Sequence, residues 1–438
     1  MATTAPLSSE PSFADLARLF GRIGLINFGG PAGQIALMHK ELVDDRRWIS
    51  EQDYLHALNF CHLFPGPEAQ QLATYVGWKL HGVKGGLAAG LLFVAPGALV
   101  MLLLSMLYAT AADLGWMQAI FLGIKAAVLA IVVQALLRMA GRSLDTGLKR
   151  GLALAAFLGL ALFNLPFPLI VLGAGVIGFV VALVRPEWLA LSLSTPSTGP
   201  KPLVLPMIRT ILIWLAIWAA PMVAVLGVLG PEHVLWDIGA FFSKLAIVTF
   251  GGAYAVLSYM AQEAVQGYGW LAAGEMADGL GLAETTPGPL IMVTQFVGFL
   301  AAYRLPEPFT PMIAGMMGAG LTTWVTFAPC FLWIFALAPW IDHLRGATRL
   351  RGALSALTAS VVGVIANLTL WFALHVMFAQ TRLIEAGPVK VTIPEWPSFD
   401  ANAAALTGLA LTLLFALKFS VFRMLGALAV AGFLLGML

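Results

Sequence analysis

Long apolar stretches with few charges dominate the chain. No Asp, Glu, Lys or Arg occurs in Gly151–Val184, Phe309–Ile341 or Gly352–Thr381. An α-helix needs about 20 apolar residues to cross a bilayer, so each stretch is long enough for at least one span. Leu87–Tyr108 is likewise uncharged, and Trp116–Leu137 carries only one charge, that of Lys125. The pattern predicts an all-α integral membrane protein with several crossings.

Composition supports this fold class. Of 438 residues, 60% are hydrophobic and 11% are charged, whereas soluble domains carry about 25% charged residues. Mean hydropathy is +0.89. The net charge of +2 does not suggest a nucleic-acid partner, and Cys61 and Cys330 form neither a disulfide framework nor a metal motif. Residues 1–12 lack the features of a cleavable signal peptide, so the chain is expected to insert through its own spans.

The sequence contains an internal duplication. Phe28-Gly29-Gly30 recurs 222 positions later as Phe250-Gly251-Gly252, and Pro65-Gly66-Pro67 recurs at the same offset as Pro287-Gly288-Pro289. Identities in the same register are Met38 with Met260, Glu41 with Glu263 and Trp48 with Trp270. The chain is therefore predicted to hold an N-terminal repeat (1–184), a linker with one connecting span at Thr210–Leu229 (185–234) and a C-terminal repeat (235–438).

Each repeat is expected to contain two discontinuous helices. Glycine tolerates the conformations that end a helix, and proline fits the first turn of the next one. The Gly29-Gly30-Pro31 break should end a half-length helix that Ser12 caps, and Pro65-Gly66-Pro67 should interrupt a second element that begins after Ser50. A further break is expected at residues 164–168, within the apolar stretch to Val184.

Loop charges indicate that the two repeats have opposite orientations. Residues 138–150 are mainly basic, whereas their counterparts, 380–400, are mainly acidic. Conversely, the short acidic loop at Asp113 corresponds to 339–351, which holds three arginines. Because basic loops favour the cytoplasm, equivalent loops should lie on opposite sides of the membrane. This pattern predicts an inverted-topology repeat, an architecture of many secondary transporters.

The break motifs resemble those of a known family. The chain is similar to the chromate ion transporter family, in its long two-repeat form, at FGGPAGQIALMHKELV, PGPEAQQLATYVGW, FGGAYAVL and AETTPGPLIMVTQFVGF. The resemblance covers most of Phe13–Leu374. It implies a multi-pass protein of the bacterial inner membrane that exports chromate and confers chromate resistance. Sulfate, of the same charge and nearly the same shape, is an expected competitor or alternative substrate.

A dianion inside a membrane must be met by hydrogen-bond donors and positive charge. Half-helix N-termini supply free N–H groups and about half a positive charge each. The breaks are therefore predicted to form the substrate site, the alternative being kinks and interhelical hydrogen bonds that serve packing. The predicted substrate-binding residues at or near the breaks are Asn27, Gly29, Gly30, Pro31, Pro65, Gly66, Pro67, Gln70, Gln71, Thr249, Gly251, Gly252, Thr285, Thr286, Pro287, Gly288, Pro289, Thr294 and Gln295.

Three cations are further substrate-binding candidates. Arg22 and Lys244 occupy equivalent positions one to two turns before the Gly-Gly breaks. They either neutralise the substrate or extend to the lipid headgroups. Lys125 is isolated within an apolar span, and an intramembrane lysine is a functional candidate by default.

Three titratable residues adjoin the Pro-Gly-Pro breaks and are candidates for proton coupling. Glu68 follows the first Pro-Gly-Pro, Glu284 precedes the second, and His62 is the first-repeat equivalent of Glu284. A carboxylate at a helix N-terminus often serves only as a cap. Beside an anion site it would instead repel the substrate when charged and admit it when protonated.

No cofactor, metal or nucleotide site is predicted. The chain has no P-loop, and His56 and His62 are poorly spaced for two ligands on one helix face. The expected function is secondary transport of chromate by alternating access around a midplane site, driven by membrane potential, protons or both. The alternatives are transport or uptake of sulfate or another oxyanion, a passive anion channel, and a membrane enzyme. Duplicated transporters often descend from dimers, so a homodimer is a further option.

Overall fold

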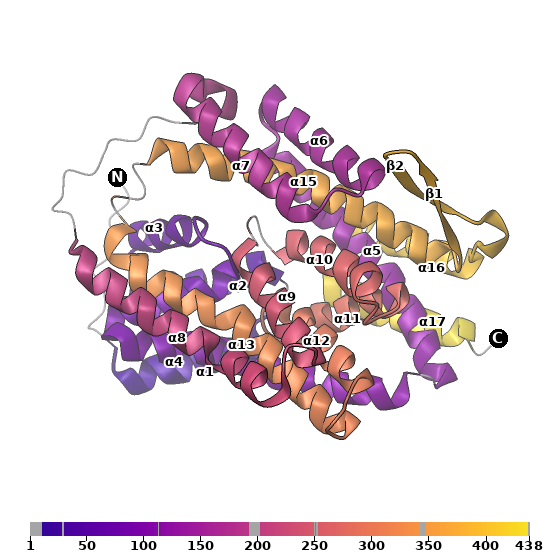
Figure 1. Ribbon diagram of the computed structural model, residues 1–438, viewed down its shortest axis with the longest axis horizontal. Helices are drawn as coiled ribbons and strands as arrows, with labels where there is room; N and C mark the ends of the chain where they lie inside the picture. The colour runs from indigo at the N-terminus through magenta and orange to yellow at the C-terminus, as the bar shows by residue number, and fades with distance from the viewer. Residues whose placement is uncertain are drawn as a thin grey trace. The chain divides into compact units, whose positions relative to one another are not determined.

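In a computed structural model of the chain, the structure describes residues 11–28, 30–112, 114–191, 202–248, 250, 253–341, 343 and 347–436. Helices make up most of these residues (Figure 1). Among the described residues, six helices are long and apolar enough to cross a membrane. The prediction of an all-α membrane protein is confirmed. These helices are α4 (Glu68–Ala111), α5 (Gly115–Ser143), α7 (Phe167–Val184), α8 (Val204–Leu229), α13 (Pro311–Leu337) and α15 (Thr348–Met377).

Local capping chemistry sets the first helices as predicted. Helix α1 (Phe13–Ile26) begins after Ser12, whose hydroxyl accepts a hydrogen bond from the Asp15 N–H. Helix α3 (Glu51–Cys61) begins after Ser50, which accepts from the Asp53 N–H in the same way. Between them, α2 (Gly30–His39) starts at the Gly-Gly-Pro break and continues as a π-helical turn, η1 (Lys40–Asp45).

The local backbone structure repeats together with the sequence. The π-helical turn η1 recurs as η3 (Gln262–Gly267), at the same offset as the sequence repeat. Gly66 and Gly288 have positive φ angles of 108° and 105°. The two Pro-Gly-Pro motifs therefore form the same kind of turn. The second-repeat counterparts of α1, α2 and α3 are α9 (Val234–Val248), α10 (Ala253–Ala261) and α11 (Ala273–Thr285).

The chain forms two compact units, and each draws on both predicted repeats. Unit 1 comprises residues 1–104, 195–253 and 286–346. In it, α13 packs against α8, α9 and α12 (Val293–Arg304), the last preceded by the 3₁₀ turn η4 (Leu290–Met292). Helix α8 runs beside α13 (Figure 1) and buries none of its own residues within the protein. Its apolar side chains are thus available to lipid.

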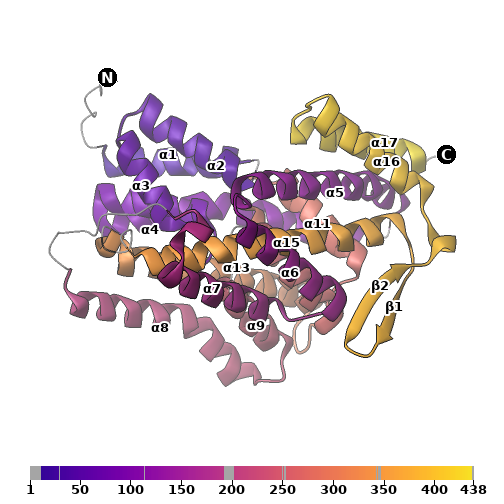
Figure 2. The same cartoon turned by 90° about the horizontal axis from the view of Figure 1, so that it is seen from above.

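Unit 2 comprises residues 105–194, 254–285 and 347–438. Helix α15 packs against α5, α6 (Gly147–Phe163) and α7. Helix α5 also contacts α11, α16 (Ala401–Leu411) and α17 (Val421–Gly436), and α16 continues as the π-helical turn η7 (Thr412–Ala416). A β-hairpin follows α15 (Figure 2) and packs against α6. Its strands are β1 (Thr381–Ala386) and β2 (Val389–Pro394).

The predicted separation of the half-helix from Glu68 and the span to Tyr108 is confirmed, because His81 and Gly82 inside α4 have non-helical backbone angles. Two local predictions were wrong. Helix α8 begins at Val204 rather than Thr210, because Pro206 lies in its first turn, where proline is tolerated. The segment 380–400, expected to be a loop, contains the β-hairpin.

Three short 3₁₀ turns complete the described elements. They are η2 (Pro186–Leu189), η5 (Ala338–Trp340) and η6 (Trp396–Ser398).

Candidate substrate site at the helix breaks

Three of the four predicted breaks meet within unit 1. The N–H of Gly288 donates to the carbonyl of Asn27 at 2.8 Å, and Gln34 Nε2 donates to the carbonyl of Gly288 at 2.6 Å. The second repeat's Pro-Gly-Pro thus lies on the first repeat's Gly-Gly-Pro break. Residues from all three breaks line one small cavity: Pro31, Gln34, Gly66, Pro67, Glu68, Ala69, Pro289, Leu290 and Ile291.

Glycines permit the close approach of these backbone segments. A Cβ at Gly97, in α4, would lie 2.5 Å from the carbonyl oxygen of Pro287 and 3.0 Å from the Cα of Gly288. A Cβ at Gly66 would lie 3.1 Å from both Cys330 Sγ and Gln71 Nε2, at a φ of +108° that disfavours other residues. The backbone itself is therefore a main component of the site.

Buried amides and hydroxyls without partners surround the breaks. Asn27 is fully buried, and no described residue hydrogen-bonds to either polar atom of its side chain. The same holds for Thr74 Oγ1 and for the side-chain oxygens of Gln34, Gln70 and Gln71, all buried. Buried polar groups are normally paired, and leaving one unpaired costs about 1–3 kcal/mol. Such a cluster is suited to a polar ligand.

The unpartnered side-chain atoms also indicate whether an anion would bind with or without its water. Asn27 Nδ2 is a donor, and the N–H groups in the first turn of α4 add to it. Thr74 Oγ1 lies instead beside Gly90, further along α4. The glutamine oxygens are acceptors and require donors of their own. An anion bound here would therefore have to bring some of its water.

The cavity at the breaks is small. Its volume is about 20 Å³, whereas a water molecule in the liquid occupies about 30 Å³ and a cavity needs roughly 10–15 Å³ to hold one. It therefore has room for about one water molecule. A tetrahedral oxyanion could enter only if the breaks moved apart.

The structure brings together two of the three predicted proton-coupling residues. His62 caps the C-terminus of α3, and Glu68 starts α4. His62 Nδ1 lies 3.3 Å from Glu68 Oε1, and the Glu68 side chain is 14% exposed. Glu284 lies instead in unit 2, where it is buried and accepts a hydrogen bond from the Tyr254 hydroxyl at 2.9 Å.

The predicted cations do not line the cavity at the breaks. The Arg22 side chain is 60% exposed, and its Nη1 lies 3.5 Å from Glu41 Oε1. Lys244 is exposed on α9. Lys125 belongs to unit 2. The cavity at the breaks is lined by helix ends, neutral side chains and the carboxylate Glu68, and by no cation among the described residues. Substrate neutralisation by Arg22 or Lys244 therefore stays a prediction.

Lys125 has a partner that the sequence analysis missed. Its Nζ lies 3.3 Å from Oδ1 of Asp278 in α11, and the Tyr108 hydroxyl donates to Asp278 Oδ2 at 2.8 Å. Asp278 is 4% exposed. An isolated intramembrane lysine requires a counter-charge, which was the signal that a carboxylate partner exists. The sequence does not show which carboxylate it is, because α11 alone holds Glu275, Asp278 and Glu284.

The remaining predicted residues divide into three groups. Thr285 donates to the Leu282 carbonyl of its own helix, and Thr294 donates to the Ile291 carbonyl of the preceding turn η4. Gln295 Nε2 donates to the Ala98 carbonyl at 2.8 Å, and this bond matches the alternative of interhelical hydrogen bonds that serve packing. Thr286 is buried. Gly29, Thr249, Gly251 and Gly252 lie outside the described residues.

Apolar spanning helices together with broken helices that meet at a polar site define a multi-pass membrane protein with the features of a transporter. The chain belongs to the chromate transporter family, which it matches over residues 14–179 and 236–436. These two matches begin 222 positions apart, at the offset of the internal duplication. The family predicted from the sequence is therefore confirmed.

Similar proteins carry consistent names. A chromate transport protein of Pseudomonas aeruginosa is 32% identical over 84% of this chain and 83% of its own length. One of Cupriavidus metallidurans is 28% identical over 80% of each chain. A probable chromate transport protein of Synechococcus elongatus is 28% identical over 81% of this chain and 83% of its own. No solved structure matches the chain.

Proposed function

We propose that the protein exports chromate across the bacterial inner membrane, by alternating access around the breaks of unit 1. The observation that carries this proposal is the meeting of three helix breaks at one small cavity, beside Asn27, whose buried side-chain amide has no partner among the described residues. Membership of the chromate transporter family supports chromate as the substrate.

In this mechanism the breaks bind the anion and also control its access to the cavity. The N-termini of α2, α4 and η4 offer N–H groups and partial positive charge to the anion. The hydrogen bonds from Gly288 to Asn27 and from Gln34 to Gly288 hold the breaks together. Their rupture would widen the cavity and admit the substrate. Breaking a few hydrogen bonds, each worth about 0.5–1.5 kcal/mol net, is an accessible conformational step.

The first experiment is chromate flux in vesicles of known protein orientation. The pH gradient and the membrane potential are clamped separately, and sulfate is added as competitor. We expect chromate to move in the direction that corresponds to export and to stop when the driving gradient collapses. Accumulation against a gradient excludes a passive channel. Inward sulfate transport that chromate only inhibits would contradict the export proposal.

Sulfate or another oxyanion is the second candidate substrate. The free donors at the breaks are the Asn27 amide and backbone N–H groups. Neutral donors of this kind recognise charge and tetrahedral shape, which chromate and sulfate share. Flux measured with each anion alone separates the two substrates, and competition by divalent over monovalent anions identifies the class.

A further inference from the structure

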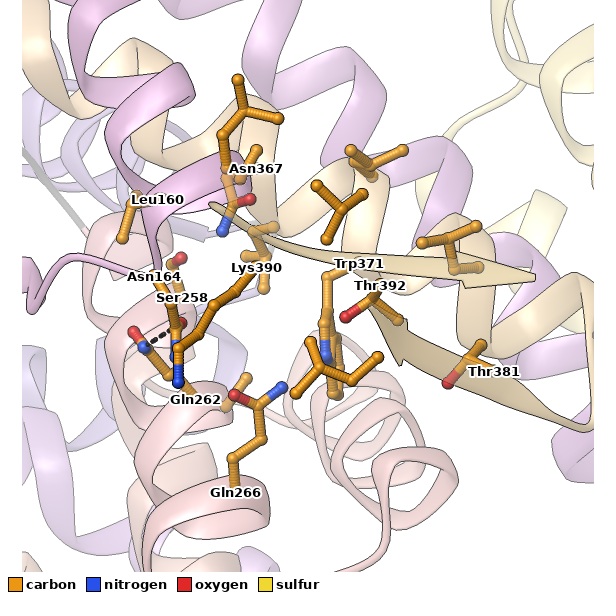
Figure 3. Close-up of a pocket in the computed structure, with 18 of the residues that line it drawn as sticks. Leu160, Asn164, Ser258, Gln262, Gln266, Asn367, Trp371, Thr381, Lys390 and Thr392 are labelled. Carbon is orange, nitrogen blue, oxygen red and sulfur yellow. Dashed lines mark hydrogen bonds between the residues drawn. The ribbon is translucent and has the colours of Figure 1, made fainter. Parts of the chain in front are cut away.

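A second polar cavity lies in unit 2, under the β-hairpin (Figure 3). Its volume is about 550 Å³, within the range of about 300–1,000 Å³ typical of small-molecule sites. It lies between the C-terminal part of α6, α10 with η3, α15 and the hairpin. None of the residues predicted at the breaks lines it.

The lining favours an anion. It contains hydrogen-bond donors and two basic side chains, and none of the described lining residues is an Asp or Glu. A metal ion or an organic cation would lack a counter-charge there, and a purely apolar ligand would leave the polar groups unpaired. Trp371 and several leucines form the apolar part. The polar lining residues are Asn164, Ser258, Gln262, Gln266, Asn367, His375, Thr381, Lys390 and Thr392.

Asn164 connects two walls of the cavity. It ends α6 in the left-handed conformation, with φ 46° and ψ 39°, which only glycine and asparagine adopt readily. Its Oδ1 accepts a hydrogen bond from Gln262 Nε2 at 2.8 Å, drawn as a dashed line in Figure 3. Glycine would satisfy the backbone equally well, so the backbone alone does not require the amide.

One face of the hairpin covers the cavity. Side chains alternate along a strand, so Thr381 and Leu383 of β1 share a face with Lys390 and Thr392 of β2. These four residues all line the cavity, and Val391 of the opposite face lines it as well. Glu385 shares the face of the four residues but is not among the lining residues. Figure 3 shows Lys390 extending from the hairpin toward Ser258 and Gln262.

Lys390 is held by an ion pair that an anion could replace. Its Nζ lies 2.8 Å from Oε1 of Glu385, its cross-strand neighbour, with the two side chains 43% and 53% exposed. An exposed pair of this kind contributes about 0–1 kcal/mol. A dianion in the cavity would compete with Glu385 for the ammonium group.

We infer that this cavity is a second binding site, which takes a tetrahedral oxyanion with most of its water. This inference rests on the proposed function, because the proposed function identifies the anion. The volume of about 550 Å³ exceeds that of one water, about 30 Å³, by more than an order of magnitude. The cavity therefore accommodates a hydrated anion, which the cavity at the breaks does not.

The test uses charge changes on the two faces of one hairpin. Lys390→Gln removes the cavity-facing cation, and Arg382→Gln removes an exposed cation on the opposite face. We expect Lys390→Gln to raise the KM for chromate about fivefold or more at unchanged kcat, the pattern of lost uniform binding. Arg382→Gln should leave KM unchanged. Glu385→Gln, which frees Lys390, should lower KM. Equal shifts in Lys390→Gln and Arg382→Gln would overturn the inference.

The amide is tested by Asn164→Gly, which keeps the left-handed backbone at the end of α6. We expect a raised KM at unchanged kcat, together with weaker equilibrium binding of labelled sulfate to the purified protein. Unaltered sulfate binding in both Asn164→Gly and Lys390→Gln would overturn the site. The site would also be overturned if these two variants lost a co-purifying anionic lipid while their KM stayed the same, because the cavity would then hold a lipid headgroup. If the wild type showed no chromate flux, the proposed function would be refuted. The second site would not be, because it is tested separately by sulfate binding.

Discussion

At the scale of single residues, a substitution at Asn27 should affect stability and transport differently. The Asn27 side chain is fully buried without a partner among the described residues, so Asn27→Leu removes an unpaired amide at similar volume. We expect an unchanged or higher unfolding temperature and at least a tenfold loss of chromate transport, about 1.4 kcal/mol. Gln295→Leu is the control, since Gln295 bonds the Ala98 carbonyl and accepts from Thr323. It should lower stability. A stability loss in Asn27→Leu equal to that in Gln295→Leu would contradict the assignment.

The buried ion pair between Lys125 and Asp278 allows a test by paired substitutions. Lys125→Met leaves the buried Asp278 without its cation. Breaking a fully buried pair costs about 3–5 kcal/mol, and this range is an upper bound here because the Lys125 side chain is 26% exposed. Replacement of both residues, Lys125→Met with Asp278→Leu, should restore the unfolding temperature. If the charges take part in transport, the double variant remains inactive in the vesicle flux assay, which is the outcome we expect. Recovery of both properties would make the pair purely structural.

Residue pairs of this kind lay beyond prediction from one sequence. Lys125 was predicted as functional because intramembrane lysines are costly. Its partner depends on which face of α11 packs against α5, and this is a tertiary contact. Gln34 and Gly97 were missed for the same reason, since both act through the distant Pro287-Gly288 segment.

At the scale of elements, the fit of α4 against the second Pro-Gly-Pro depends on Gly97. A methyl group there would lie 2.5 Å from the Pro287 carbonyl oxygen. We therefore expect Gly97→Ala to displace this turn, lower the unfolding temperature and reduce transport severely. Gly21→Ala in α1 is the matched control, because nothing lies within 4 Å of the position that its Cβ would occupy. It should stabilise α1 by about 0.5–1 kcal/mol. Similar thermal shifts in both variants would contradict the role of Gly97.

Elements with local signals were predicted well. Ser12 and Ser50 cap α1 and α3, and the Gly-Gly-Pro and Pro-Gly-Pro motifs separate helices where expected. The hairpin was missed because the segment 380–400 was interpreted by its charge. Its β-branched residues and Gly387, with a φ of +61°, are typical hairpin signals. That three breaks would meet in one unit is a non-local property and was only a hypothesis.

At the scale of the whole molecule, the sequence repeats and the compact units divide the chain differently. Each unit contains segments of both repeats. Glu68 with His62 belongs to unit 1, whereas Glu284 and the Lys125–Asp278 pair belong to unit 2.

The charge of the substrate determines the energy available for export. Moving one charge across 100 mV is worth about 2.3 kcal/mol, so a dianion leaving a negative interior gains about 4.6 kcal/mol. This corresponds to a concentration ratio on the order of a thousand. The membrane potential alone is therefore sufficient for export, whereas uptake would need more than two protons per dianion. We expect outward flux to persist with the pH gradient collapsed and to fall steeply when the potential is collapsed.

Protons would then control binding rather than supply the energy. If Glu68 controls binding as predicted, its charged form repels a dianion at the breaks and its neutral form admits it, and the wild-type KM then depends on pH. Glu68→Gln is permanently neutral and should keep a low KM throughout; Glu284→Gln tests the second repeat in the same way. Because chromate itself changes protonation near neutral pH, the inhibition constant of sulfate, which stays dianionic, is measured in parallel. If both variants retain the wild-type pH dependence for both anions, protonation of these carboxylates does not control transport and His62 is the remaining candidate.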